Sequence, residues 1–231
     1  MNFIDTHTHL YAEEFDPDRE AVIREAVEKG VFRLLLPAID RSHYERMMSV
    51  VSRHSENCFP MIGLHPTSVK ADFREELDFV KETLEKNREK FHGIGEIGID
   101  LYWDKTFADE QTFAFNYQLD LAIEYQLPVA IHTRNSFEIA IRMIREKNNP
   151  ELKGVFHCFR DRLNRHNKQW NWGSCWVLAV SSLIRILDCR KWWKSPDSRT
   201  LCWRPMLPIF HLLLTVGSVM KALLFRSSRK K

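Results

Sequence analysis

The sequence is poor in the features that mark secreted and thiolate-bound metal proteins. It holds 5 cysteines in 231 residues, and they lie far apart with no C-x-x-C pair. We therefore expect neither a disulfide framework nor a thiolate zinc site. The first residues also lack the basic start and apolar stretch of a secretory signal peptide. These absences predict reduced thiols and a cytoplasmic protein.

Glutamate is absent from the last part of the chain, residues 160–231. This segment carries 3 acidic and 15 basic side chains, together with six of the seven tryptophans, whereas residues 1–159 carry 28 acidic and 19 basic side chains. The net charge of +3 therefore hides a negative first part and a strongly positive tail. Because average composition does not change so sharply within one domain, the chain divides into two segments near residue 160.

Short apolar runs alternate with longer amphipathic stretches in residues 1–159. The apolar runs are 3–5, 32–37, 59–65, 93–100, 128–133 and 154–159, and the amphipathic stretches are 16–29, 41–53, 73–89, 110–125 and 136–147. This alternation predicts βα units around a parallel sheet, and therefore an α/β fold. A closed barrel of eight such units typically needs about 250 residues, so residues 1–159 supply most of one.

Two histidines follow the first predicted strand, at the end where the loops of a barrel gather an active site. His7 and His9 form an H-x-H pair. Alternation along a strand puts residues i and i+2 on the same face, so both imidazoles can reach one metal ion. Taken alone, the spacing fits a pair of surface histidines equally well.

Further metal-binding residue types lie at the same end of later strands. Glu96 lies in the apolar run G-E-I-G-I-D, where a carboxylate must be paired, protonated or bound to metal. His132 and His157 each end an apolar strand. One such histidine is more often a hydrogen-bonded core residue. Four histidines and one glutamate at the same end of successive strands indicate a metal site instead.

Five motifs in residues 1–159 resemble those of the TatD family of metal-dependent hydrolases. They are D-T-H-T-H-L at 5–10, G-L-H-P at 63–66, G-E-I-G-I-D at 95–100, I-H-T-R at 131–134 and F-H-C-F at 156–159. The resemblance implies a (β/α)₈ TIM-type barrel and a deoxyribonuclease-type phosphodiesterase that uses two divalent metal ions. It implies His7, His9 and Glu96 on one ion, and Glu96, His132 and His157 on the other. The implied substrate is DNA or another phosphodiester.

The resemblance also implies supporting roles for three residues near these ligands. His65 and Asp100 would orient the ligands or contact the substrate, and Arg134 would meet a phosphate. From the residues alone, His65 is also interpretable as a loop cap before Pro66, and Arg134 as an exposed surface arginine. Zinc, magnesium and manganese all fit the ligand types, and no feature indicates an oligomeric state.

The family's later E-T-D-A-P-Y motif, whose aspartate completes the ligands of the first ion, is missing from this chain. A one-base shift recovers it. Because tryptophan has a single codon, residues 170–177 force the string E-L-G-x-x-L-G in the shifted frame. Residues 201–210 permit V-L-E-T-D-A-P-Y-L in that frame, and residues 215–221 permit R-G-K-R-N-E. We predict that residues 160–231 are a frameshifted reading of the same gene.

A frameshift would leave the last barrel strands lost or non-native, and hydrolysis strongly reduced or absent. One alternative is a non-catalytic pseudogene or artefact product. Another is a basic, tryptophan-rich tail that binds nucleic acid by phosphate contacts and stacking. The apolar run 206–225 resembles a membrane segment, but His211 and Lys221 interrupt it and Pro208 lies near its start. No membrane partner is expected.

Overall fold

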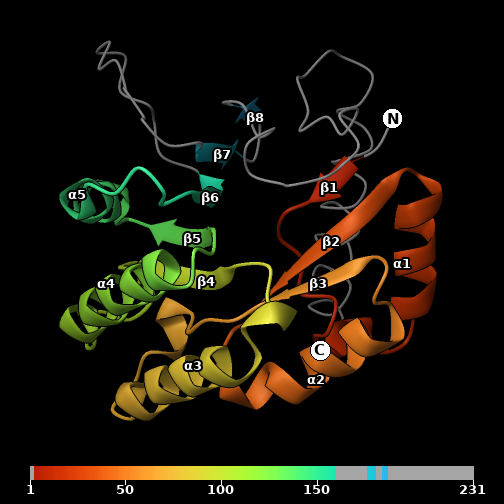
Figure 1. Ribbon diagram of the computed structural model, residues 1–231, viewed down its shortest axis with the longest axis horizontal. Helices are drawn as coiled ribbons and strands as arrows, with labels where there is room; N and C mark the ends of the chain where they lie inside the picture. Colours follow the sequence, from red (N-terminus) through yellow and green to blue (C-terminus); the bar gives the residue numbers. More distant parts are fainter. Residues whose placement is uncertain (1–2, 160–175, 181–183, 187–231) are drawn as a thin grey trace, which may run out of the picture.

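A computed structural model describes residues 3–159, 176–180 and 184–186, in which strands and helices alternate (Figure 1). The strands are β1 (Phe3–Asp5), β2 (Val31–Pro37), β3 (Cys58–Met61), β4 (Ile94–Asp100), β5 (Val129–Arg134), β6 (Gly154–Phe159), β7 (Trp176–Val180) and β8 (Ile184–Ile186). The α-helices are α1 (Arg19–Glu28), α2 (Tyr44–Arg53), α3 (Phe73–Asn87), α4 (Ala108–Glu124) and α5 (Phe137–Lys147). Short 3₁₀ helices are η1 (Glu13–Phe15), η2 (Arg41–His43), η3 (Pro66–Ser68) and η4 (Arg88–Lys90).

The strands form two sheets, in the orders β1-β2-β3 and β4-β5-β6-β7-β8. Neighbouring strands are parallel up to β7, and β8 runs antiparallel to β7. A parallel bridge between Ile62 and Ile94 joins the sheets, and the Ala38 N–H donates to the Gly95 carbonyl at 2.8 Å. The five α-helices lie on the outer side of the strands (Figure 1). The predicted α/β fold with parallel strands is confirmed.

The predicted elements match the observed ones to within a few residues, with two informative differences. The run 59–65 continues past the end of β3 at Met61. Ile62 still forms the bridge to Ile94, and the chain leaves the sheet after it, where the Leu64 N–H donates to the Gln118 side chain at 2.7 Å and the His65 N–H to the Ile39 carbonyl at 2.8 Å. The stretch 16–29 is helical only from Arg19, after the separate turn η1.

Side chains on the strands alternate between two faces. One buried cluster contains Leu35, Met61, Ala130 and Val155, from four different strands. Their sequence neighbours Leu34, Ile131 and Phe156 belong instead to the large cluster that includes helix residues. Phe156 meets Phe137 of α5 with ring centroids 5.2 Å apart. Each such buried side chain contributes about 1.5–3 kcal/mol through removal from water, so both faces hold the strands in register.

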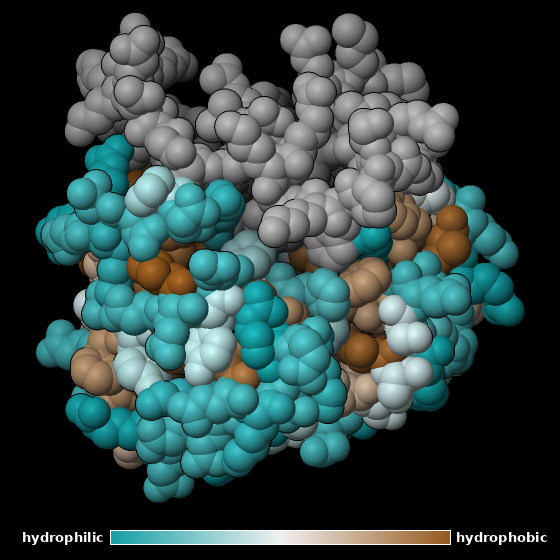
Figure 2. All heavy atoms as spheres, in the orientation of Figure 1, coloured by the Kyte–Doolittle hydropathy of each residue, from teal (hydrophilic) through white to brown (hydrophobic). Residues whose placement is uncertain are grey.

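The outer face over α3 and α4 is mostly hydrophilic, with small separate hydrophobic spots (Figure 2). None of the helices in the described part of the chain has the length and apolar character that a bilayer crossing requires. The apolar run 206–225 and the segments that carry the shifted-frame motifs at 201–210 and 215–221 lie outside the described residues.

Glycine is required at position 98 of β4. Gly98 is paired with His132 of β5 and has a φ of +141°, which side-chain-bearing residues rarely adopt. A Cβ atom there would lie 2.0 Å from the His132 carbonyl oxygen. The absent side chain therefore lets β4 and β5 approach at the position of a histidine that the sequence assigns to the metal site.

Gly98→Ala is expected to lower the free energy of unfolding by at least about 2 kcal/mol, because it combines a clash with backbone and a strained φ. Urea denaturation followed by circular dichroism measures this change. An unchanged unfolding midpoint would show that β4 and β5 are not in close contact at this position.

Candidate metal centre

Glu96 of β4 lies at the centre of a cluster of histidines. Its side chain is almost completely buried, with the residue 2% exposed. Its Oε2 atom lies 3.1 Å from His7 Nε2 and 3.3 Å from His9 Nε2. Its Oε1 atom lies 3.1 Å from His132 Nδ1. The two carboxylate oxygens therefore face different histidines.

Among the residues that the structure describes, the potential ligand atoms form two groups that share Glu96. One consists of His7, His9 and Glu96, and the other of His65, Glu96 and His132; within each group these atoms lie within 4.8 Å of one another. A carboxylate shared in this way is the arrangement that can bridge two metal ions.

The backbone explains why His7 and His9 point the same way. Both follow β1, and the intervening Thr8 N–H donates to the Leu35 carbonyl of β2 at 3.0 Å. The segment therefore continues along β2 with strand-like alternation, which places residues 7 and 9 on one face. Ala130 belongs to the buried cluster that also contains Leu35, Met61 and Val155. His132 lies two residues after Ala130 on β5, so its side chain points to the same face of the sheet.

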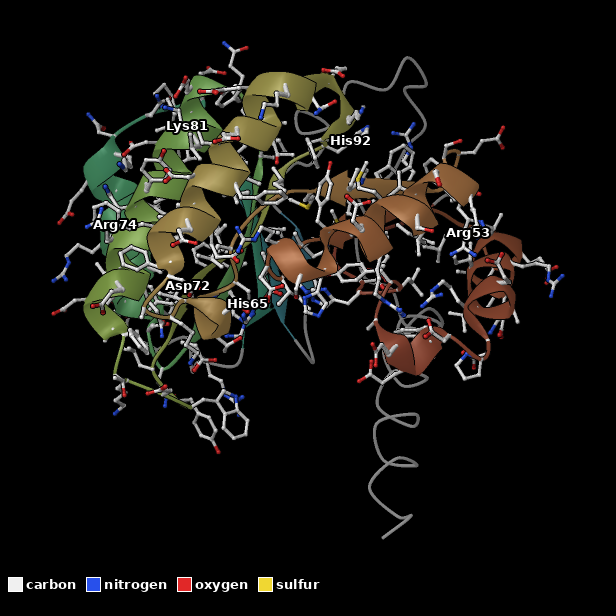
Figure 3. The ribbon with its side chains drawn as sticks, turned by 90° about the horizontal axis from the view of Figure 1, so that it is seen from below. Arg53, His65, Asp72, Arg74, Lys81 and His92 are labelled. Atoms are coloured by element: carbon white, nitrogen blue, oxygen red, sulfur yellow. The ribbon has the colours of Figure 1, made fainter. Side chains whose placement is uncertain are left out.

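His65 combines the two interpretations that the sequence allowed. Its Nδ1 accepts from the Thr67 N–H at 3.2 Å, which caps η3. Its Nε2 lies 3.5 Å from Glu96 Oε2, and its ring centroid is 4.7 Å from that of His132. Figure 3 shows His65, which follows β3, and His92, which precedes β4, at opposite ends of the strands. The cluster therefore lies at the carboxyl ends of the strands, where a barrel places its active site.

The register of β6 brings His157 next to this cluster along the backbone. The strand pairing sets His157 beside His132. The side chain of His157 lies outside the described residues, so its role as a ligand stays a prediction.

Tyr11 is a buried residue of the site that no sequence motif indicated. Its hydroxyl donates to the Pro37 carbonyl at 2.6 Å, and the same oxygen lies 2.8 Å from His9 Nδ1. Because its hydrogen is already used, the oxygen must accept from His9 Nδ1–H. Burial, with the charges of Glu96 and Asp40, raises the pKa of Tyr11, so the hydroxyl stays protonated. The other ring nitrogen, His9 Nε2, faces Glu96.

Asp100 has the corresponding position behind His132. Its Oδ2 lies 2.9 Å from His132 Nε2, and its Oδ1 accepts from the backbone N–H groups of Tyr102 and Trp103 at 2.9 and 3.2 Å. Burial alone would raise the pKa of Asp100, but these N–H groups and His132 lower it. The ionised carboxylate holds a proton on His132 Nε2 and so aims Nδ1 at Glu96.

The charges at the centre fit a divalent cation. Burial alone would raise the pKa of Glu96, but His7, His65 and His132 hold that pKa well below its usual range. Burial lowers the pKa of His7 and favours the neutral ring. His7 Nε2 and His9 Nε2 lie 3.0 Å apart around the ionised carboxylate. Imidazole nitrogens and a carboxylate gathered in one place are the ligand types that zinc and similar metals bind.

Arg134 does not stand alone on the surface. It is partly buried, and its guanidinium carbon lies 3.7 Å from the ring centroid of Tyr102 and 4.9 Å from that of Trp103. Sequence patterns gave no sign of the two aromatic residues, because they follow the G-E-I-G-I-D motif in a loop without periodicity. They could have been noticed only as large aromatics next to a candidate site.

Comparison with known proteins places these features in a family. The profile of the family described as TatD related DNase matches residues 4–186. The protein named Uncharacterized metal-dependent hydrolase YabD from Bacillus subtilis is 36% identical over 155 residues, which are 67% of this chain and 60% of that protein. The protein named 3'-5' ssDNA/RNA exonuclease TatD from Erwinia tasmaniensis is 31% identical over 67% of this chain and 59% of its own length. The chain thus spans about 60% of the length of these curated relatives.

Solved structures agree. The TatD homologue YJJV from Escherichia coli K12 superimposes with a TM-score of 0.63 at 30% identity, covering 69% of this chain and 61% of that one. A hydrolase of the TatD family from Entamoeba histolytica superimposes with a TM-score of 0.65 at 23% identity, covering 78% and 65%, and supports the fold. The chain belongs to the family of TatD related DNases.

Proposed function

We propose that this chain has the site of a two-metal phosphodiester hydrolase that acts on DNA or a related nucleic acid. The observation that supports this most directly is the position of Glu96 between histidines: its Oε2 lies near His7, His9 and His65, and its Oε1 lies near His132. His7, His9 and Glu96 would hold one ion. Glu96, His132 and His157 would hold the other. The printed name of the Erwinia relative, a ssDNA/RNA exonuclease, supports a nucleic-acid substrate.

Two divalent ions, when bound, would supply the Lewis acidity that activates water and stabilises the leaving oxygen of a phosphodiester. The protein's part is to orient their ligands. Tyr11 and Asp100 each contact one ring nitrogen of His9 and of His132, so the other nitrogen of each ring is turned toward Glu96 and the proposed ions. His65 lies at the edge of the centre with its Nε2 toward Glu96, where it can contact either a ligand or the substrate.

We further propose that turnover by this chain is impaired, because the aspartate of the E-T-D-A-P-Y motif is not encoded in this frame. The change in composition near residue 160 and the motifs in the shifted frame support this proposal. The family match extends past that point to residue 186, over the part that contains β7 and β8. The gene sequence is the direct test of where the frame changes.

Restoring the shifted frame after residue 159 is expected to raise hydrolysis of a single-stranded oligonucleotide by at least about 10²-fold, because it returns the aspartate ligand together with the last barrel strands that position the site. The rates of both chains are measured with manganese, magnesium or zinc present, and with a chelator. Equal rates for the two chains would contradict the proposed loss of the aspartate.

In the restored-frame chain, Glu96→Gln is expected to abolish this hydrolysis, because a neutral amide cannot bridge two cations. Glu82→Gln is the matched control, since Glu82 lies on α3 in an exposed pair with Lys86. A Glu96→Gln chain with unchanged rate would rule out the proposed centre.

Tyr11→Phe is expected to weaken metal binding by about 10- to 100-fold, because His9 loses the acceptor that fixes its proton on Nδ1. Equilibrium dialysis of the full chain against a divalent metal measures the dissociation constant without any need for turnover. Tyr44→Phe, on α2 against Phe79, is the control and should bind as the wild type does. If both variants bind equally well, Tyr11 does not orient His9.

Asp100 both contacts His132 and accepts hydrogen bonds from the backbone of Tyr102 and Trp103. Asp100→Asn is expected to change the first contact and keep the second. The amide oxygen can still accept from the Tyr102 and Trp103 N–H groups, but the amide nitrogen would face His132 Nε2–H as a second donor. We expect a loss of metal affinity of about 10- to 100-fold with the fold retained. The control is Asp104→Asn in the same loop, whose carboxylate is half exposed. Wild-type affinity in Asp100→Asn would show that this pair does not set the orientation of His132.

A further inference from the structure

Two large aromatic side chains stand exposed beside the metal centre. Tyr102 and Trp103 are 52% and 69% exposed. Their rings meet edge to face, with centroids 4.9 Å apart. Within the described residues, other large hydrophobics with high exposure are Val27 and Phe113, which lie on outer helices. Exposed aromatic rings that are held in place mark binding surfaces.

This pair is fixed to the metal centre through one carboxylate. Asp100 accepts from the backbone N–H of both aromatic residues and from His132, a predicted metal ligand. Arg134 lies two residues after His132 on β5, and its guanidinium covers both rings. The rings are therefore positioned relative to the site of hydrolysis.

The surroundings add a cavity and a second cation. Trp103 and Asp100 line an open cavity of about 320 Å³, together with Lys70 and Phe107. The Lys70 ammonium lies 3.4 Å from Asp104 and 5.5 Å from the Phe107 ring centroid. The cavity thus combines the aromatic rings of Trp103 and Phe107 with one cation, Lys70, and aromatic rings beside a cation are features of sites that hold single-stranded nucleic acids.

Charge alone does not explain how a polyanion would be held here. Residues 1–159 carry 28 acidic and 19 basic side chains, so their net charge repels a nucleic acid. Stacking does not depend on net charge, and every base offers a flat face to an aromatic ring. Stacking of a base near the metal centre would therefore contribute more affinity than the net charge of residues 1–159.

We propose that Tyr102, Trp103 and Arg134 form a stacking site for one unpaired nucleobase next to the phosphodiester to be cleaved. The inference rests on the proposed function and adds the position and chemistry of a base-binding site to it. An unpaired base has a free face to stack on Trp103, whereas a base within a duplex already stacks on its neighbours. The site therefore selects single strands or frayed ends.

The test measures the binding of a short fluorescein-labelled single-stranded oligodeoxynucleotide to the full chain by fluorescence anisotropy. Excess chelator prevents cleavage. A series of probes carries one abasic nucleotide at each position in turn. We expect the wild type to lose about 5- to 150-fold in affinity when the stacked base is the one removed. Trp103→Ala should remove this difference, and Trp103→Phe should keep most of it.

Phe113→Ala is the matched control, because Phe113 is also exposed and also lies under an arginine, Arg74, at 4.8 Å. It should bind the whole series as the wild type does. If Trp103→Ala shows the same dependence on base position as the wild type, the proposal is overturned. The same holds if no single abasic position weakens binding.

The stacking site and the proposed hydrolase can fail independently of each other. Metal-dependent hydrolysis by the restored-frame chain that Trp103→Ala leaves unchanged, with no dependence on base position, would retain the hydrolase and reject the stacking site. A dependence on base position, together with no metal-dependent hydrolysis by the restored-frame chain, would support the stacking site and reject the hydrolase.

Discussion

The site depends on keeping an ionised carboxylate inside a protein. Glu96 is buried in a strand between apolar residues, and an isolated charge there would be prohibitively unfavourable. The compensation comes from His7, His65 and His132, which three separate parts of the chain bring to the same end of the sheet. The parallel arrangement of β1 to β6 makes this possible, because it gathers the carboxyl ends of the strands.

A second layer of contacts determines how the histidines point. Tyr11 and Asp100 each hold one nitrogen of a histidine, so the other nitrogen faces Glu96. Asp100 also fixes the loop that carries Tyr102 and Trp103. Asp100 thus contacts both the proposed metal centre and the aromatic loop, and removal of its side chain would disturb both.

Much of the fold could be predicted because βα alternation is a local pattern, and the G-E-I-G-I-D strand showed its buried carboxylate directly. Tyr11 could not be found in this way, since its hydrogen bond to Pro37 spans 26 positions and leaves no periodicity. The stacking of Arg134 on Tyr102 also depends on two strands meeting. The end of β3 was misplaced because Gln118 of α4, far away in sequence, takes the backbone of Leu64 out of the sheet.

The central proposal is that Glu96 would be shared by two metal ions, and electron paramagnetic resonance of the full chain titrated with Mn²⁺ tests it most directly. Two ions that share one carboxylate interact magnetically, so the account predicts a spin-coupled spectrum at two Mn²⁺ per chain, which Glu96→Gln loses. A spectrum of isolated Mn²⁺ at every ratio, identical in the wild type and in Glu96→Gln, would contradict it.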